Sequence, residues 1–391
     1  MTAPEPSPSG KPWMAQSLAQ GAAGIALLHI ERAHTGQGTW KQAHTWITKA
    51  VADEVSAADT TGLYLGAPAV AYMLNAAVDS SARYQDALAT LDRHVSALAH
   101  RRAAAGIARA RRGEQPTFHE YDIFFGLTGI GAHLLRRDPG GGALEHVLRY
   151  LVQLTRPLTN DGQELPGWWV AHDQRTRTSA RYPGGHSNQG AAHGVTGPLM
   201  LLAQAARRGI TVDGQLGSMN TICAWLDTWQ QHGETGAWWP ECVSLADLHA
   251  GRPSQQGSAR PSWCYGTPGI ARAQQLAAIA TGDTQRQQAA EQHLIRCLSD
   301  PVQLSRITDS GLCHGWAGVY QTVWRAAHDA ITPALSGHVT RLADALTHHT
   351  EPEQGTAPGF LDGDAGTALA LNTAMQRSAP TSGWDRCLLI D

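Results

Sequence analysis

Short glycine turns alternate along this chain with runs of apolar residues. Each turn consists of a glycine, two further residues and a small residue, and an apolar run follows directly. Runs such as residues 25–30 and 198–206 have almost no polar side, which predicts helices that are buried on most sides. The glycines let the chain turn sharply and let helix ends approach one another. Seven turns of this kind begin at Gly21, Gly66, Gly126, Gly194, Gly266, Gly315 and Gly363.

Between the turns lie segments of a second kind, with one apolar stripe and a polar back. Tyr84, Leu88, Leu91, Val95 and Leu98, for example, follow one another at steps of three or four residues. Such spacing is typical of helices that lie on the outside of a domain.

Seven buried helices alternating with six half-exposed ones predict an all-α fold. The predicted architecture is an α/α toroid, a double-layered helical barrel with seven inner helices; a linear solenoid is the competing arrangement. The pattern does not say which elements close the ring. Strand-like sequence is confined to loops, chiefly 164–171 and 237–245. Each loop carries a tryptophan pair, which we expect to fill core rather than to line a peptide groove.

Composition narrows the possible classes of partner. The chain has 391 residues and a net charge of −3, so it offers no basic stripe and we expect no nucleic-acid partner. No apolar run reaches the roughly 18 residues of a membrane span, so we expect no stable membrane insertion. Residues 1–10 lack the pattern of a signal peptide. We therefore expect a cytoplasmic protein with a disordered tail at 1–11 and a single toroid domain at 12–391.

Two cysteines and one histidine stand directly before two of the turns. Cys264 lies in a Trp-Cys-Tyr-Gly sequence, and Cys313 and His314 lie in Cys-His-Gly. In a toroid all turns lie at one end, so these side chains would converge on one mouth although they are 49 positions apart (313 − 264). Two sulfurs and one imidazole suit zinc, and three protein ligands leave the fourth position open. A lone cysteine would be an ordinary buried residue, as we expect for Cys223 and Cys297, but the repeated position favours a metal site.

Four further residues near the turns could carry chemistry. His193 precedes its turn as His314 does, and its role could be fourth ligand, general acid or base, or a turn residue that bonds the backbone. Asp122 could cap a helix or orient a catalytic group, and Asp362 is expected to act as a cap. Arg260, four residues before Cys264, could orient a carboxylate or carbonyl, or could be a solvated loop arginine.

The segments Trp263-Cys264-Tyr265-Gly266, Cys313-His314-Gly315 and Ala192-His193-Gly194 resemble the signature of the lanthionine synthetase C (LanC-like) cyclases. The glycine turns match as well, and the resemblance extends from about residue 17 to 376. The cysteine–histidine triad in its repeat context is a specific signal, whereas the turns alone are not. One departure is Ala69, which stands where the other turns have their second glycine.

Members of that family are α/α toroids with zinc at the mouth, and they close thioether rings in dehydrated precursor peptides. The resemblance implies that one Zn²⁺ per chain is bound by Cys264, Cys313 and His314. It implies acid–base work for His193 and Asp122.

By the same resemblance, Arg260 and Tyr265 line the catalytic site. The chain length resembles the stand-alone cyclases of class I lanthipeptide pathways, which implies a dehydrated precursor peptide as substrate and a dehydratase as partner.

The implied reaction adds a peptide cysteine thiol to dehydroalanine or dehydrobutyrine. Zinc would stabilise the thiolate, His193 is the first candidate to protonate the α-carbon, and Arg260 could stabilise the enolate oxygen. Two alternatives stay open: a LanC-like enzyme that adds glutathione, and a non-catalytic, zinc-stabilised peptide-binding scaffold of a biosynthetic complex. Paired carboxylates of the glycosidase type are absent from the turns.

Overall fold

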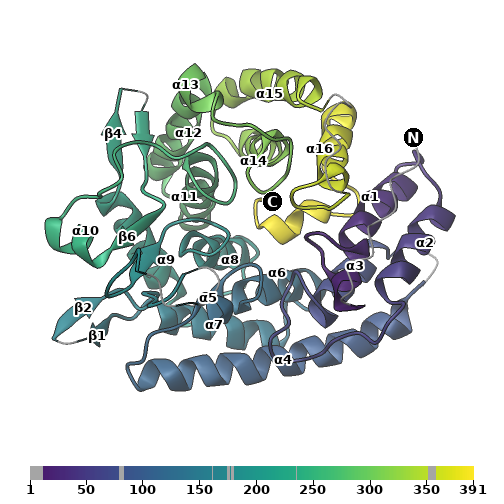
Figure 1. Cartoon of the computed structure of the whole chain (residues 1–391), viewed down its shortest axis with the longest axis horizontal. Coiled ribbons are helices and arrows are strands. Elements are labelled where there is room, and N and C mark those ends of the chain that lie inside the picture. The colour runs from purple at the N-terminus through teal and green to yellow at the C-terminus, as the bar shows by residue number, and fades with distance from the viewer. Residues whose placement is uncertain are drawn as a thin grey trace.

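A computed structural model describes residues 12–78, 83–160, 162–173, 177, 180–234, 236–350 and 358–391. The expected N-terminal tail at 1–11 lies outside these residues. Within them the helices form two concentric layers around a central axis (Figure 1). The predicted α/α toroid is therefore confirmed.

The inner layer consists of the helices that follow the glycine turns. They are almost entirely buried, as their lack of a polar side requires. In the described part of the chain these are α1 (Ala22–His34), α3 (Ala67–Ala76), α6 (Leu127–Arg137), α8 (Thr196–Arg207), α11 (Thr267–Thr281), α14 (Trp316–His328) and α16 (Asp364–Gln376).

The outer layer consists of the amphipathic helices, which turn one apolar face inward. Its members in the described residues are α2 (Trp40–Ala50), α4 (Gln85–Arg111), α7 (Gly142–Leu154), α9 (Gln215–Thr228), α12 (Thr284–Ser299) and α15 (Ser336–His348). Shorter helical turns join the layers: η1 (Pro12–Gln16), α5 (Phe118–Tyr121), α10 (Leu245–Ala250), α13 (Pro301–Leu304), η2 (Pro333–Leu335) and η3 (Trp384–Leu388).

The strands are short and lie in loops at one side of the toroid (Figure 1). β1 (Leu158–Asn160) pairs with β2 (Gln163–Leu165), and β4 (Gln231–Gly233) pairs with β5 (Gly236–Trp238), both antiparallel. β3 (His186–Asn188) pairs antiparallel with β6 (Cys242–Ser244). The tryptophan pairs at 168–169 and 238–239 are buried, as core residues should be.

The ring is closed by its first and last inner helices, since α1 packs against α16. This contact excludes the linear solenoid. Among the described residues, no helix combines the length and the apolar character that a membrane span would need.

A circle of backbone hydrogen bonds joins all seven turns. In each turn an N–H donates to a carbonyl oxygen of the next turn, and the seventh donates back to the first, at N···O distances of 2.8–3.2 Å. The bonds are Leu18 to Tyr64, Tyr64 to Phe124, Ile123 to Ala192, Ala191 to Cys264, Cys264 to Cys313, Leu312 to Leu361, and Phe360 to Ala19. The mouth of the toroid is therefore a continuous hydrogen-bonded rim.

The second glycine of each motif has a steric cause. A Cβ at Gly24 would lie 2.0 Å from the carbonyl oxygen of Leu18, and a Cβ at Gly366 would lie 1.8 Å from that of Phe360. In both cases the oxygen belongs to the residue six positions earlier in the same turn. Only hydrogen fits there, so the glycine permits the turn to fold back on the first turn of its helix.

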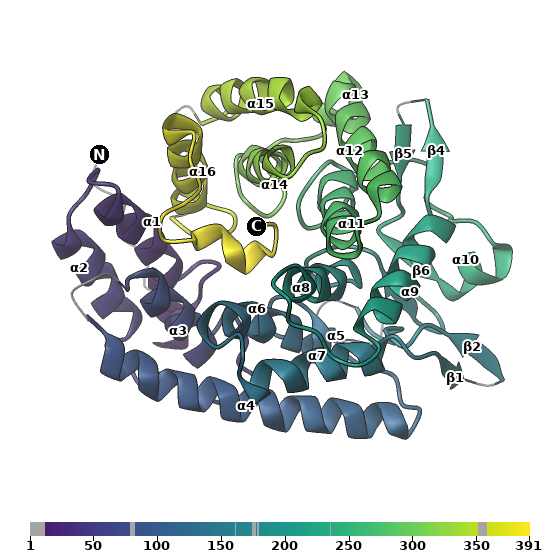
Figure 2. The same ribbon diagram turned by 180° about the vertical axis from the view of Figure 1, so that it is seen from behind.

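The C-terminal segment occupies the centre of the ring, where Figure 2 shows it between the inner helices. Leu388 and Ile390 are fully buried. The Leu388 carbonyl accepts a hydrogen bond from the Trp263 indole at 3.0 Å, and the Ile390 carbonyl accepts one from Arg272 Nε at 2.9 Å. The hydrophobic pattern did not predict this axial segment.

We expect Gly24→Ala to lower the free energy of unfolding by about 1–3 kcal/mol or more, because the new methyl group meets backbone rather than a movable side chain. The measurement is urea unfolding followed by circular dichroism. Gly217→Ala is the matched control: it also replaces the third residue of a helix, but in the outer layer, where a Cβ meets nothing within 4 Å. It should raise stability by up to about 1 kcal/mol. Equal effects of both substitutions would contradict the steric explanation.

Candidate functional site

The turns before α11 and α14 lie side by side at the mouth. The Cys264 N–H donates to the Cys313 carbonyl at 3.2 Å, and this bond belongs to the rim that joins all turns. Gly266, with φ of +101°, directs the chain into α11 in a conformation that side chains disfavour. Ser262 stabilises the same turn, since its hydroxyl accepts the Tyr265 N–H at 3.1 Å.

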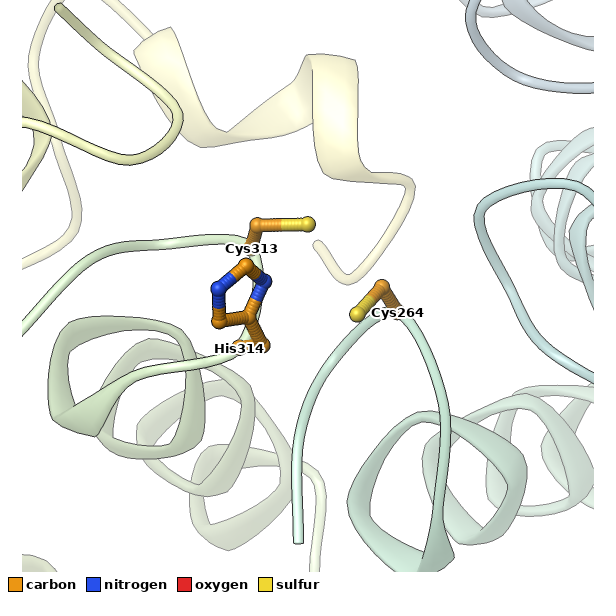
Figure 3. Close-up of side chains that lie close together, drawn as sticks. All are labelled: Cys264, Cys313 and His314. Carbon is orange, nitrogen blue, oxygen red and sulfur yellow. The ribbon is translucent and has the colours of Figure 1, made fainter. Parts of the chain in front are cut away.

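One sulfur from each cysteine and one nitrogen of His314 form a compact group at this mouth (Figure 3). The ligand atoms of Cys264, Cys313 and His314 lie within 4.8 Å of one another. Cys264 is buried, and the other two residues are half-buried. Among the described residues the group contains no fourth histidine, cysteine or carboxylate, so the protein supplies three ligand atoms and no fourth.

The electrostatics of the group favour one thiolate. Hydrogen bonds from Cys313 and from His314 hold the pKa of Cys264 well below its usual value, against the opposing effect of burial. The pKa of Cys313 is raised by its hydrogen bond to Cys264 and by burial, and that of His314 is raised by its hydrogen bond to Cys264. Two sulfurs and an imidazole at this spacing fit the donor set of a zinc site with one open position.

His193 and Asp122 lie within hydrogen-bonding distance of each other on neighbouring turns. His193 Nδ1 lies 2.7 Å from Asp122 Oδ2, and Asp122 is fully buried. The carboxylate holds the proton on Nδ1, which leaves Nε2 to accept or donate a proton. Of the three roles open to His193, this pairing favours acid–base work over metal binding, because the histidine lies outside the cysteine–histidine group.

Asp122 binds the turn before α6 but does not cap that helix, whose N-cap is Gly126 with no side-chain bond to the helix end. Its Oδ1 accepts the N–H groups of Phe125 and Gly126 at 2.7 and 2.8 Å, which stabilises the turn. Its Oδ2 holds His193. One carboxylate thus shapes the turn and orients the imidazole.

The pair adjoins the cysteine–histidine group through the backbone. The N–H groups of Ala191 and Ala192 donate to the Cys264 carbonyl at 2.9 and 3.4 Å. The ring of Phe124 packs at 4.9 Å from that of His193 and at 6.3 Å from that of Trp263. The His193–Asp122 pair and the cysteine–histidine group are therefore connected by backbone hydrogen bonds and by the ring of Phe124.

Tyr265 and Arg260 are both anchored by polar residues that the sequence did not single out. Tyr265 Oη accepts a hydrogen bond from Asn188 Nδ2 at 2.8 Å. Arg260 Nη1 donates to Asp309 Oδ2 at 3.4 Å, so it is paired rather than simply solvated. Asn188, Arg260 and Asp309 each stand six residues before the first glycine of a turn, and that shared position is the signal that could have identified the two anchors.

Asp362 does not cap a helix, and that prediction is wrong. The N-cap of α16 is Gly363, and no side chain bonds the helix end there. Asp362 Oδ1 instead lies 3.8 Å from His314 Nδ1. The residue before the glycine points into the mouth, as His193 and His314 do.

Fold and site together define a class of protein: an α/α toroid with a two-cysteine, one-histidine group and a carboxylate–histidine pair at its mouth. A family model described as "Lanthionine synthetase C-like protein" matches residues 12–389. The chain therefore belongs to the lanthionine synthetase C-like family.

Two individual proteins are similar to this chain. The nisin biosynthesis protein NisC of Lactococcus lactis subsp. lactis is 22% identical over 338 residues, which cover 85% of this chain and 78% of that protein. The solved structure of nisin cyclase matches with a TM-score of 0.81 and 22% identity, over 97% of this chain and 93% of that one. The structural likeness supports the toroid fold.

A cluster of aromatic rings packs beside His193. The ring of Phe118 has His172, His186 and His193 as neighbours at 5.0, 5.6 and 6.1 Å, and Tyr182 stacks on His186 at 4.0 Å. His186 is 1% exposed, and its Nδ1 has no hydrogen-bond partner among the described residues. Burial lowers the pKa of His186 from 6.5 to about 4, so this histidine is neutral in the folded protein at neutral pH.

This buried histidine predicts a pH dependence of stability. Below pH 6.5 the unfolded chain binds a proton at His186, whereas the folded chain does so only near pH 4, so stability falls as the pH drops through this window. The difference corresponds to about 3 kcal/mol. We expect His186→Phe to reduce the stability lost between pH 6.5 and 4 by up to this amount, measured by urea unfolding at several pH values. His94→Phe on the exposed side of α4 is the control, and equal pH profiles for His186→Phe and wild type would refute the prediction.

Proposed function

We propose that this protein is a cyclase that closes thioether rings in a dehydrated precursor peptide. The reaction adds the thiol of a peptide cysteine to the β-carbon of dehydroalanine or dehydrobutyrine. The observation that carries the proposal is the proximity of two groups at one mouth: the Cys264, Cys313 and His314 cluster and the His193–Asp122 pair. Membership of the lanthionine synthetase C-like family supports it.

The cluster would hold one zinc ion per chain through the two sulfurs and the imidazole. When bound, zinc supplies a positive charge that stabilises a substrate thiolate, which at its ordinary pKa of about 8.5 is mostly protonated near neutral pH.

The remaining site residues would transfer a proton to the substrate and stabilise the negative charge that develops on it. As the S–C bond forms at the β-carbon, the electron pair of the C=C bond moves toward the neighbouring carbonyl oxygen and gives an enolate. His193, held through Nδ1 by Asp122, would deliver a proton from Nε2 to the α-carbon. Arg260 would stabilise the enolate oxygen, and Tyr265 would line the site beside it.

The substrate would be a precursor peptide whose serine and threonine residues have been dehydrated, and a dehydratase is the partner that we propose. We further propose that residues 12–391 act as one domain in the cytoplasm. The rim of hydrogen bonds, the contact of α1 with α16 and the axial C-terminal segment all support one unit. A non-catalytic scaffold would need the bonds of Asp122 Oδ1 to its turn, but it would not need the contact of Oδ2 with His193 at the mouth.

We expect the purified protein to contain one zinc ion per chain and Cys313→Ala to lose it, because two protein ligands hold zinc poorly. The measurement is elemental analysis of both proteins. Cys223→Ala is the control, since this buried cysteine of α9 lies outside the cluster and its replacement should leave zinc content unchanged. Full zinc content in Cys313→Ala would refute the ligand assignment.

We expect His193→Asn and Asp122→Asn each to slow ring closure by about 10²–10⁴-fold, because both remove positioned proton transfer. Zinc content and melting temperature should stay at wild-type values, since the amide oxygen that Asp122→Asn introduces can still accept the two turn N–H groups before α6. Mass spectrometry of a dehydrated peptide with thiol labelling measures the rate. Unchanged rates would remove the pair from the mechanism. If the wild type and both variants all failed to close rings, the non-catalytic scaffold would be favoured.

A further inference from the structure

One carboxylate oxygen of Asp309 lies close both to His314, a proposed metal ligand, and to Arg260, which we propose stabilises the enolate. Asp309 Oδ2 lies 3.6 Å from Nε2 of His314 and 3.4 Å from Nη1 of Arg260. We propose that Asp309 is a positioning residue that orients His314 as a metal ligand and at the same time places Arg260 over the reacting carbonyl. The second half of this inference rests on the proposed cyclase function, whereas the first half does not.

Asp309 is well suited to hold other groups because it is itself fixed. Its Oδ1 accepts the Gly311 N–H at 3.0 Å, and its backbone carbonyl accepts the Trp316 N–H at 3.0 Å. Both bonds lie in the turn that leads into α14. With Oδ1 engaged in the turn, Oδ2 is the oxygen that faces His314 and Arg260.

The contact with His314 selects a tautomer. A neutral imidazole carries its proton on one nitrogen and a lone pair on the other. At 3.6 Å the carboxylate is an electrostatic neighbour rather than a hydrogen-bond partner, and it favours the proton on the adjacent Nε2. Figure 3 shows Nδ1, the nitrogen next to the carbon that bears the side chain, on the side of the two sulfurs. The lone pair then points to the place where the sulfurs converge, as a metal ligand requires.

The contact with Arg260 limits the motion of a flexible side chain. Arg260 is 36% exposed, and an unpaired arginine in such a place would sample many rotamers. Arg260 and Asp309 stand at the same position of successive repeats, six residues before Gly266 and Gly315, so adjacent turns bring them together. The ion pair therefore spans the same two turns as the cysteine–histidine group.

Asp362 is the alternative carboxylate for His314. Its Oδ1 lies 3.8 Å from Nδ1, and its side chain is 45% exposed, compared with 35% for Asp309. A proton held on Nδ1 by Asp362 would block the nitrogen that faces the sulfurs. Asp362 therefore offers a matched control with similar distance and exposure but on the opposite nitrogen.

The first experiment measures zinc affinity by competition with a chromogenic chelator, without any peptide. We expect Asp309→Asn to weaken zinc binding about 10- to 100-fold, the usual effect of removing a carboxylate behind a histidine ligand. The substitution keeps an oxygen that can accept the Gly311 N–H, so the fold should be retained, which thermal unfolding checks. Asp309→Glu should recover part of the affinity, and Asp362→Asn should leave it at the wild-type value. Wild-type affinity in Asp309→Asn, or a larger loss in Asp362→Asn, would overturn the orientation role.

The second experiment tests the link to Arg260 with a double-mutant cycle on ring closure at saturating zinc. We expect Arg260→Ala and Asp309→Asn each to lower kcat more than they raise KM, and the double variant to be little slower than Arg260→Ala alone. Arg260→Ala should leave zinc affinity unchanged. Rate losses that multiply independently would show that Asp309 does not act through Arg260. Absence of ring closure in the wild type would refute the cyclase function while the affinity result still decides the role at His314.

Discussion

The closed rim of backbone hydrogen bonds is the constraint on which the rest of this structure depends. Each turn must donate an N–H to the next turn and also fold back on its own helix, so that a carbonyl oxygen comes within about van der Waals contact of the residue six positions later. A Cβ at that residue would meet this oxygen in six of the seven turns, whereas the turn before α3 accommodates Ala69. The glycine motif thus serves the hydrogen-bonded rim and is independent of the chemistry at the mouth, which is why it also occurs in turns that carry no site residue.

The rim also explains how residues far apart in sequence form one site. The bond between the Cys264 N–H and the Cys313 carbonyl is one link of the circle, and it places the two thiols on adjacent turns. Equivalent positions of successive turns then face the same space. The residue directly before the first glycine is a histidine, a tyrosine and a histidine in three consecutive turns, namely His193, Tyr265 and His314.

The sequence allowed the two layers, the seven turns and the cysteine–histidine group to be predicted, because each repeats with a regular position or a 3.6-residue period. The roles of Asn188 and Asp309 depend on side-chain hydrogen bonds between turns, and their shared position six residues before a first glycine was the one sequence signal for them, which was not used. Asp362 was misassigned for a related reason: an aspartate before a glycine turn can cap a helix or face the mouth, and the choice depends on tertiary position. The ring-closing contact of α1 with α16 joins the two ends of the repeat array, where no periodicity can indicate a partner.

The C-terminal segment in the centre of the ring is held by specific polar contacts, although the inner helices around it are almost uniformly apolar. Arg272 is fully buried, and burial lowers its pKa to about 10, yet it remains charged beside Asp329 at 2.6 Å. Arg325 and Asp385 form a second such pair at 2.7 Å. Buried pairs of this kind add little net stability. Arg325 binds Asp385 of the C-terminal segment, and Arg272 donates to the Ile390 carbonyl of the same segment, so we infer that these two arginines fix the register of that segment. That register matters at the mouth, because the Leu388 carbonyl holds the indole of Trp263, the residue directly before Cys264. The turn that carries Cys264 is therefore held from two sides, by the rim and by the axial segment, and this double support fixes the position of the Cys264 sulfur.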